Sequence, residues 1–200
     1  MKKIIFTVCF LFFSVGVMAQ DLQPAEENSL AQEIQQRFAS VQTLSASFTQ
    51  EKHMSLLEQP VTSAGYFAFS KDPAKIRWEY TEPFQNGFLM SEGKTFRLEE
   101  GIKKPVKNAM SSHIAAQMMM WLSFDLTELS KNYEVEYFER GVMLYPKGKI
   151  TVLQKITAWF STENPQALEK IRLDEPGGDY TLLRFLNPQI NQPLKKELFQ

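Results

Sequence analysis

The sequence has few of the residues that metal sites and many catalytic sites use. Its 200 residues include one cysteine, Cys9, and two histidines, His53 and His113, which lie far apart in the chain. No His, Cys or carboxylate cluster near either histidine has the spacing of metal ligands. There is also no glycine-rich phosphate loop and no nucleophile elbow. These absences argue against a metal site and against an enzyme, and they imply no cofactor.

The sequence also has no excess of charge of either sign. It carries 22 basic and 23 acidic side chains, a balance that argues against a nucleic-acid-binding protein. The densest group of charges is interpreted as solvated loop residues and not as a binding site. It consists of Glu99, Glu100, Lys103, Lys104 and Lys107.

The first 19 residues have the pattern of a cleavable export signal. Lys2 and Lys3 precede an apolar run from Ile4 to Val15, and Ala19 provides the small residue of a cleavage point. The run is shorter than the roughly 20 apolar residues that a membrane-spanning helix needs. An uncleaved anchor is the alternative interpretation. We expect cleavage after residue 19.

The mature chain, residues 20–200, is expected to form one exported domain. Cys9 lies inside the apolar run and does not directly follow a cleavage site, so the mature chain is expected to have neither a lipid anchor nor a disulfide. Its net charge would be about −3, because the signal removes two lysines. A chain of this length builds a core without disulfides. Export without disulfides indicates the bacterial periplasm, where we expect a soluble monomer.

Two helical segments are predicted. The first begins at Ser29, which has capping-box spacing to Gln32. Its apolar stripe is Leu30, Ile34, Phe38 and Val41. The second covers about 111–129, with a short helix restarting at Asp125. Its apolar stripe is Ile114, Met118, Trp121 and Leu122.

Short extended segments separated by turn residues fill the rest of the chain. The clearest one alternates Ile76, Trp78 and Tyr80 with charged neighbours, so one of its faces is apolar. The predicted strands are 46–50, 65–69, 75–80, 88–90, 95–98, 134–138, 142–145, 150–152, 155–160, 168–173 and 180–186. This order predicts a mainly β fold with helices (α+β), in which a single twisted antiparallel sheet forms a half-barrel and a helical lid covers its concave apolar face.

Methionine is concentrated in the second helical segment, at Met110, Met118, Met119 and Met120. Methionine is flexible and polarisable, which suits a surface that re-packs around varied apolar ligands. Residue chemistry alone favours the alternative, in which these side chains fill the core.

Several segments, taken in order, resemble the LolA family of periplasmic lipoprotein carriers. They are Ala46-Ser47-Phe48-Thr49-Gln50, Gly65-Tyr66-Phe67-Ala68-Phe69, Pro73, Ile76-Arg77-Trp78-Glu79-Tyr80, Pro83, Ser91-Glu92-Gly93-Lys94, Ile171 to Asp174, Gly178-Asp179-Tyr180-Thr181, Phe185, Asn187, Asn191 and Phe199. The resemblance extends over the mature chain.

The resemblance implies an eleven-stranded half-barrel that holds the acyl chains of a lipoprotein in transit from the inner to the outer membrane, without catalysis. An inner-membrane release complex and an outer-membrane acceptor would be its partners. It also favours ligand contact over core filling for the methionines. The implied cavity lining is Phe48, Phe67, Phe69, Ile76, Trp78, Tyr80, Phe88, Met90, Phe96 and Leu98, and the implied lid is Ile114, Met118, Trp121 and Leu122.

One position departs from the family pattern. The family commonly has an arginine directly before the proline of the third segment, where it helps to hold the lid closed. This chain has Asp72 there, and Lys71 is adjacent but not equivalent. The way in which the lid is held is therefore left open.

Two other functions remain open from the sequence. A LolA-like carrier of a glycolipid or another lipid-like product would have a similar sequence. A periplasmic regulatory module that senses lipid or peptide also uses such a half-barrel, although it normally carries a second domain. The outer-membrane acceptor of the same fold is itself a lipoprotein, and the missing acylation cysteine argues against that role.

Overall fold

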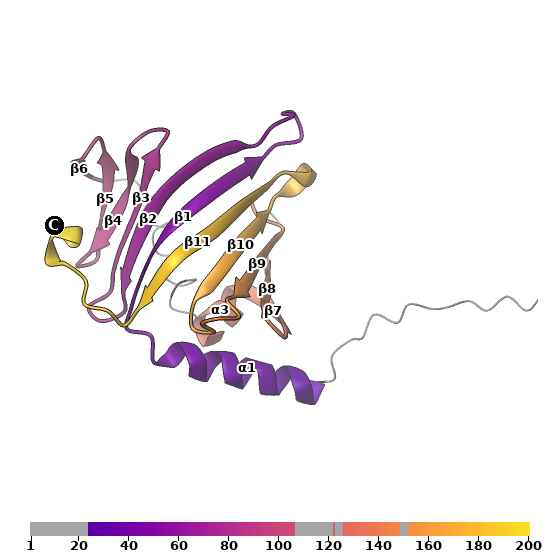
Figure 1. Cartoon of the computed structure of the whole chain (residues 1–200). Coiled ribbons are helices and arrows are strands. Elements are labelled where there is room, and N and C mark those ends of the chain that lie inside the picture. Colours follow the sequence, from indigo (N-terminus) through magenta and orange to yellow (C-terminus); the bar gives the residue numbers. More distant parts are fainter. Residues whose placement is uncertain (1–23, 107–121, 123–125, 149–151) are drawn as a thin grey trace, which may run out of the picture.

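The structure is a computed structural model that describes residues 24–106, 122, 126–148 and 152–200. The described strands form one eleven-stranded antiparallel sheet (Figure 1), in the order β6-β5-β4-β3-β2-β1-β11-β10-β9-β8-β7. The sheet curves so that its two edge strands recede behind its middle (Figure 1). The predicted mainly β fold, a single antiparallel sheet of half-barrel form, is confirmed.

The sheet consists of two meanders that meet at one pair of strands. The first is β1 (Thr43–His53), β2 (Val61–Ser70), β3 (Lys75–Glu82), β4 (Asn86–Ser91), β5 (Lys94–Glu99) and β6 (Ile102–Pro105). The second is β7 (Tyr133–Phe138), β8 (Gly141–Pro146), β9 (Lys155–Phe160), β10 (Leu168–Asp174) and β11 (Tyr180–Ile190). Because β11 pairs with β1, the two meanders form one continuous sheet.

The described helices are α1 (Pro24–Ala39), α3 (Leu126–Asn132) and two short 3-10 turns, η1 (Pro176–Gly178) and η2 (Lys196–Phe199). None of the helices in these ranges is long and apolar enough to cross a membrane. The short helix predicted to restart at Asp125 corresponds to α3. Residues 111–121 of the second predicted helical segment lie outside the described residues.

Three predictions about these elements are wrong. The first helix begins at Pro24, so Ser29 lies within α1 and does not cap it. Proline is favoured in the first turn, where its missing N–H has no helical partner to lose. The segment 102–105, interpreted as loop, is the edge strand β6, in which the charges of Lys103 and Lys104 stay exposed. Val152, predicted as strand, lies outside any strand.

Pairing across the sheet keeps the side chains of neighbouring strands in step. Trp78 of β3 pairs with Phe67 of β2 and with Phe88 of β4, and Phe67 pairs with Ala46 of β1. Directly paired residues point to the same side of a sheet, and successive residues along a strand alternate. We call the side that carries these residues the inner face and the opposite side the outer face.

Helix α1 crosses one end of the sheet, the α1 end, and polar contacts fix its C-terminus there. Asn191, at the end of β11, accepts a hydrogen bond from the Gln42 N–H at 2.7 Å and donates one to the Ser40 carbonyl at 3.0 Å. Gln166 donates to the Arg37 carbonyl at 3.2 Å. The Phe38 ring lies 4.9 Å from that of Phe160. The end of helix α1 is therefore tied to the β9 to β11 part of the sheet.

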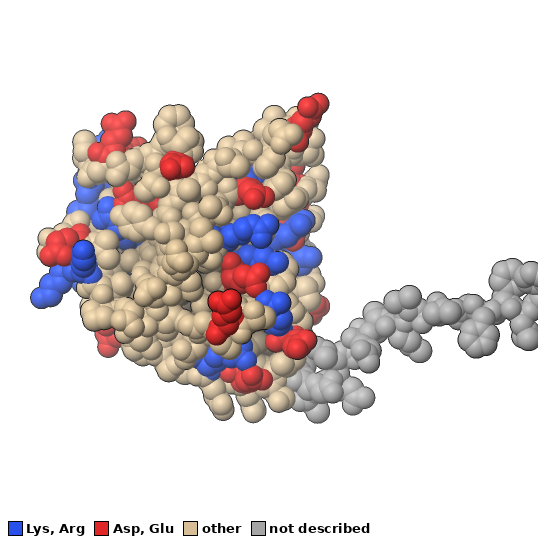
Figure 2. Space-filling model, in the orientation of Figure 1, with Lys and Arg blue, Asp and Glu red and all other residues tan. Residues whose placement is uncertain are grey.

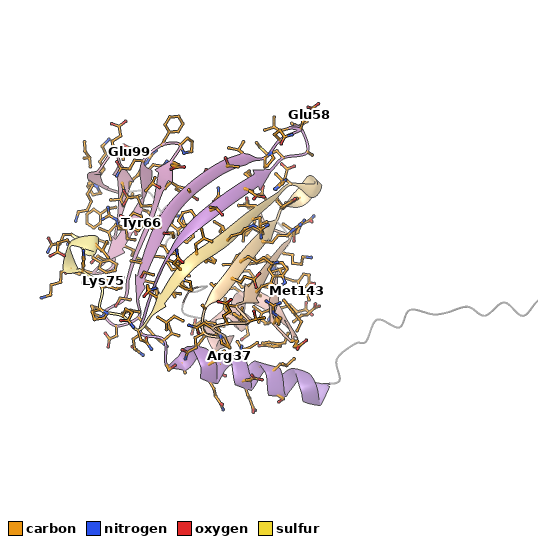
Figure 3. The ribbon with its side chains drawn as sticks, in the orientation of Figure 1. Arg37, Glu58, Tyr66, Lys75, Glu99 and Met143 are labelled. Carbon is orange, nitrogen blue, oxygen red and sulfur yellow. The ribbon has the colours of Figure 1, made fainter. Side chains whose placement is uncertain are left out.

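The opposite end of the sheet, the far end, carries the turns 54–60, 83–85 and 175–179. In Figure 3, Glu58 and Glu99 mark the far end, and Arg37 marks α1 at the other. The two ends differ because α1 packs its buried side chains, Ile34 and Phe38, at only one of them.

The outer face is polar and charged. Figure 2 shows basic and acidic side chains close together over the β9 to β11 side of this face. There, Arg172 donates a hydrogen bond to Asp174 at 2.7 Å and lies 3.8 Å from the centre of the Tyr180 ring, and His53 stacks on the same ring at 4.3 Å. This part of the outer face is therefore solvated, in contrast to the inner face.

Glu79 is a buried carboxylate on the outer face, 1% exposed. It accepts hydrogen bonds from the Tyr66 hydroxyl at 2.6 Å, from Arg77 Nε at 2.7 Å and from Gln85 Nε2 at 2.9 Å. Arg77 also donates to the Leu198 carbonyl at 3.1 Å. Burial alone would raise the pKa of Glu79, but these donors outweigh it and hold the pKa below 4.5. This network joins β2, β3 and the C-terminal segment.

The Glu79 network predicts a loss of stability in acid. Because the folded-state pKa is lowered, the stabilisation is complete above pH 4.5 and is lost as the pH falls through the lower, folded-state value. Urea unfolding measured between pH 7 and pH 3 should therefore show that the free energy of unfolding falls less below pH 4.5 for Glu79→Gln than for the wild type. Equal losses in the two proteins would contradict this role for the carboxylate.

Gly65 lies on the inner face between two aromatic rings, since it pairs with Phe48 on one side and Tyr80 on the other. A Cβ atom there would lie 2.1 Å from the Glu79 carbonyl oxygen and 2.8 Å from the Phe48 ring. The absence of a side chain lets the Phe48 and Tyr80 rings meet edge to face at 5.3 Å.

Gly65→Ala should destabilise the fold by about 1 to 3 kcal/mol, the usual cost of overpacking. Urea unfolding should show a lower midpoint with an unchanged slope. Thr62→Ala, at an exposed position of the same strand, is the control and should leave the midpoint unchanged. A midpoint for Gly65→Ala equal to that of the wild type would show that the site has room for a side chain.

Candidate functional site

The inner face is apolar from β7 at one edge of the sheet to β4 near the other. Its buried side chains join those of the helices in one cluster, and several partly buried side chains pack against it. From the sheet, the cluster contains Leu44, Ala46, Phe48, Phe67, Phe69, Ile76, Trp78, Tyr133, Val142, Leu144, Ile156, Ala158, Phe160, Leu168, Ile171, Leu183 and Phe185. Tyr80, Phe88, Met90, Val135, Tyr137, Leu173 and Ile190 pack against it.

Aromatic rings occupy the centre of this face. Trp78 stacks on Phe48 at 4.3 Å and on Phe67 at 5.4 Å between ring centres. Phe185 of β11 meets Phe67 edge to face at 5.4 Å. These rings come from β1, β2, β3 and β11, so they span the junction between the two meanders. They give the face a broad apolar surface with no charge of its own.

The apolar surface ends at β5. Phe88 of β4 pairs with Arg97, which places Arg97 and Glu99 of β5 on the inner side of the sheet. Arg97 lies 2.8 Å from Glu99, and Lys104 of β6 lies 2.5 Å from the same carboxylate. The charged trio closes the inner face at this edge.

Eight of the ten residues predicted to line a cavity lie together on the inner face. They are Phe48, Phe67, Phe69, Ile76, Trp78, Tyr80, Phe88 and Met90. The contact of these side chains with a ligand stays a prediction.

The placement of Phe96 and Leu98 with those eight is wrong. Phe96 pairs with Leu89, and Leu98 pairs with Gly87, so both lie on the outer side. Lys103 covers the Phe96 ring at 4.3 Å. The sequence predicted a strand at 95–98, but which of its faces lies beside the inner side of β4 depends on the turn between the two strands. A shift of one residue there exchanges the faces.

The second meander supplies apolar residues that the sequence prediction left out of the site. Its strands contribute Val142, Ile156, Ile171, Leu183 and Phe185 to the inner face. For β7, whose Val135 and Tyr137 pack against the same cluster, the signal was present in the sequence, because the segment 134–137 alternates acidic and apolar side chains.

Of the four predicted lid residues, Ile114, Met118 and Trp121 lie outside the described residues. Leu122 is described, and it is buried in the same cluster as the inner face. Leu129 of α3 and Phe38 of α1 belong to that cluster as well. Side chains from helical segments therefore cover part of the inner face.

Asp72, the position linked by the resemblance to lid closure, lies exposed in the turn 71–74 at the α1 end. The Lys71 N–H beside it donates to the Gln42 carbonyl at 2.8 Å. This turn is therefore tied to the segment that joins α1 to β1.

Residues 39–200 match the family model described as outer membrane lipoprotein carrier protein LolA. The chain belongs to this family. The match begins at the last residue of α1 and covers every strand of the sheet.

Proteins named outer-membrane lipoprotein carrier protein are similar to this LolA-family chain. The one from Cupriavidus taiwanensis is 31% identical over 153 residues, 70% of this chain and 66% of its own length. The one from Azotobacter vinelandii is 26% identical over 194 residues, 94% and 91% of the two chains. The chain thus spans slightly less than two thirds of the first relative and most of the second.

A solved structure of MucB also resembles this chain, with a TM-score of 0.52 and 13% identity over 85% of this chain and 62% of that one. At this identity the likeness concerns the fold alone.

A matched pair of substitutions tests which face receives apolar molecules. Phe88 and Phe96 are both half-buried, on the inner and the outer face respectively. Phe88→Glu should weaken binding of the fluorescent probe 1-N-phenylnaphthylamine by at least tenfold, since a carboxylate in an apolar site costs several kcal/mol. Phe96→Glu should leave binding within about twofold. The reverse order would contradict the assignment of the inner face.

Proposed function

We propose that the inner face holds the acyl chains of lipoproteins and that this protein carries them through the periplasm from the inner to the outer membrane. The observation that carries the proposal is the apolar surface shared by nine strands, from β7 to β4, and centred on the Trp78 ring cluster. Membership in the LolA family supports it. The names of the similar Cupriavidus and Azotobacter proteins agree with it.

The size of the hydrophobic effect explains why such a surface is needed. Each methylene buried is worth about 0.8 kcal/mol, so one common acyl chain left in water costs on the order of 10 kcal/mol. A carrier that provided the whole of this stabilisation would release its cargo too slowly. Its net affinity must therefore be lowered by a competing interaction.

Packing of the helices against the sheet provides that competition. The rings of the inner face are already buried in this structure, with Phe48 and Phe67 each 1% exposed. Helical side chains, including Phe38, Leu122 and Leu129, are part of the same cluster. A ligand gains contact with the face only when it displaces such packing. The cost of opening then reduces the affinity to a level at which an acceptor can take over the cargo.

Helix α1 is a poor candidate for the helical segment that a ligand displaces from the inner face. Its C-terminus is held by Gln166, and the Ser40 carbonyl directly after it is held by Asn191. The segment that contains Leu122 lies between β6 and α3 in the chain, and we propose that it opens. The predicted lid residues Ile114, Met118 and Trp121 belong to this segment.

The proposal is tested by what the protein binds in the periplasm. The tagged chain is purified from the periplasm of a bacterium that makes it, and bound molecules are identified by mass spectrometry. Triacylated protein is the expected result. Purification of a variant with Phe88→Glu serves as the control and should recover much less of it.

Other recovered molecules would contradict lipoprotein carriage. Free glycolipid would favour a carrier of that lipid. A stoichiometric protein partner without acyl chains would favour a regulatory module. A second assay is direct: the purified chain should release newly made lipoproteins from spheroplasts into solution, and an absence of release would overturn the proposal.

A further inference from the structure

The inner face is not apolar along its whole length. At the far end, four neighbouring strands, β3, β2, β1 and β11, place polar side chains on this face. Gln50 of β1 pairs with Ser63 of β2, and two residues further along β1, Lys52 pairs with Thr181 of β11. Tyr80 of β3 points to the same side, since it shares the inner face with Trp78. We call Gln50, Lys52, Ser63, Tyr80 and Thr181 the polar band.

The polar band borders directly on the aromatic cluster. Gln50 lies two residues beyond Phe48 on the same side of β1, which is about 7 Å along the strand. The Tyr80 ring packs edge to face against Phe48 at 5.3 Å. The inner face is therefore amphipathic along the strands, with rings in its middle and polar groups at the far end.

Gln50 and Tyr80 form a fixed pair. The Tyr80 hydroxyl donates to Gln50 Oε1 at 2.8 Å, and both side chains are partly buried. Burial raises the pKa of Tyr80, so the hydroxyl keeps its proton at neutral pH and stays a donor. This bond uses the oxygen of the Gln50 amide and orients its NH₂ group. Among the described residues, that NH₂ group has no partner.

The charge of the band is balanced. Lys52 forms an ion pair with Glu175 of the turn after β10, and both are partly buried. Each charge is thereby neutralised by the other, so the band offers no net positive charge to a phosphate. Among its donors, the two amide N–H groups of Gln50 are the ones that the bond to Tyr80 holds in a fixed orientation. Such donors suit an uncharged carbonyl, as in an ester or an amide.

We infer that the polar band binds the uncharged ester and amide carbonyls that join acyl chains to their carrier group, with Gln50 as the donor and the chains directed towards the α1 end. This inference rests on the proposed function and deepens it. The arrangement distinguishes an acylated ligand from a bare hydrocarbon. It also sets the direction in which the chains enter, because the α1 end is closed by Phe38 and Ile34.

Two probes separate recognition of the carbonyl group from apolar binding. One is a synthetic triacylated lipopeptide, and the other is 1-N-phenylnaphthylamine, which has no carbonyl. Gln50→Leu should weaken binding of the lipopeptide about tenfold, which is the effect of one hydrogen bond in a partly buried site. The affinity for 1-N-phenylnaphthylamine should stay within twofold of the wild-type value. Gln50→Glu keeps an acceptor for Tyr80 but loses the donors, so it should weaken lipopeptide binding at least as much.

The control is the same substitution on the outer face. Gln189 of β11 is exposed there, paired with Ser45, and Gln189→Leu should change neither affinity. Competition between two lipids with the same acyl chains tests whether the polar band prefers an uncharged ligand. The uncharged diacylglycerol should displace the lipopeptide better than the charged phosphatidic acid.

Equal losses for both probes in Gln50→Leu would show a packing effect and overturn the inference, as would no loss for either. Stronger competition by phosphatidic acid would also overturn it. These results differ from a failure of the proposed function, in which the wild type itself binds no lipopeptide.

Discussion

The structure depends on one constraint. Side chains alternate between the two faces along each strand, and directly paired residues of neighbouring strands place their side chains on the same face. From β7 to β4 this alternation places apolar side chains on one side without interruption. The pairing of β1 with β11 matters most, because it carries the phase from one meander to the other, with Phe48 directly opposite Phe185. A sheet whose two halves were out of phase would divide its apolar surface between two faces, and neither could shelter an acyl chain.

The two faces have different tasks. The outer face holds the sheet together by polar contacts, of which the carboxylate of Glu79 with its donors from three segments is the most buried. Apart from the polar band, the inner face is left to apolar contact. Helical side chains satisfy that contact in the structure described, and in the proposed carrier the cargo replaces some of them. The same surface thus supports the fold and would bind the ligand, which is how a carrier keeps its affinity within a range that allows release.

Much of this arrangement could be predicted from the sequence. The alternation of Ile76, Trp78 and Tyr80 with charged neighbours identified both a strand and its apolar side. Phase across a turn was harder to predict. Phe96 and Leu98 alternate as clearly as Phe88 and Met90, but the register places them on the outer face. Gln50 was also missed, since a single glutamine in an alternating strand gives no signal until the register places it beside Tyr80. The edge strand β6 was missed because its lysines suggested a loop.

Tryptophan fluorescence tests the central claim, that the inner face is the surface that binds acyl chains. The chain has three tryptophans, Trp78 on the inner face, Trp159 on the outer face and Trp121 outside the described residues. A fatty acid brominated along its chain quenches indole fluorescence only by contact. In a variant with Trp121→Phe and Trp159→Phe, the remaining Trp78 should be strongly quenched. In a variant with Trp78→Phe and Trp121→Phe, Trp159 should be unaffected. Quenching of Trp159 without quenching of Trp78 would contradict the account.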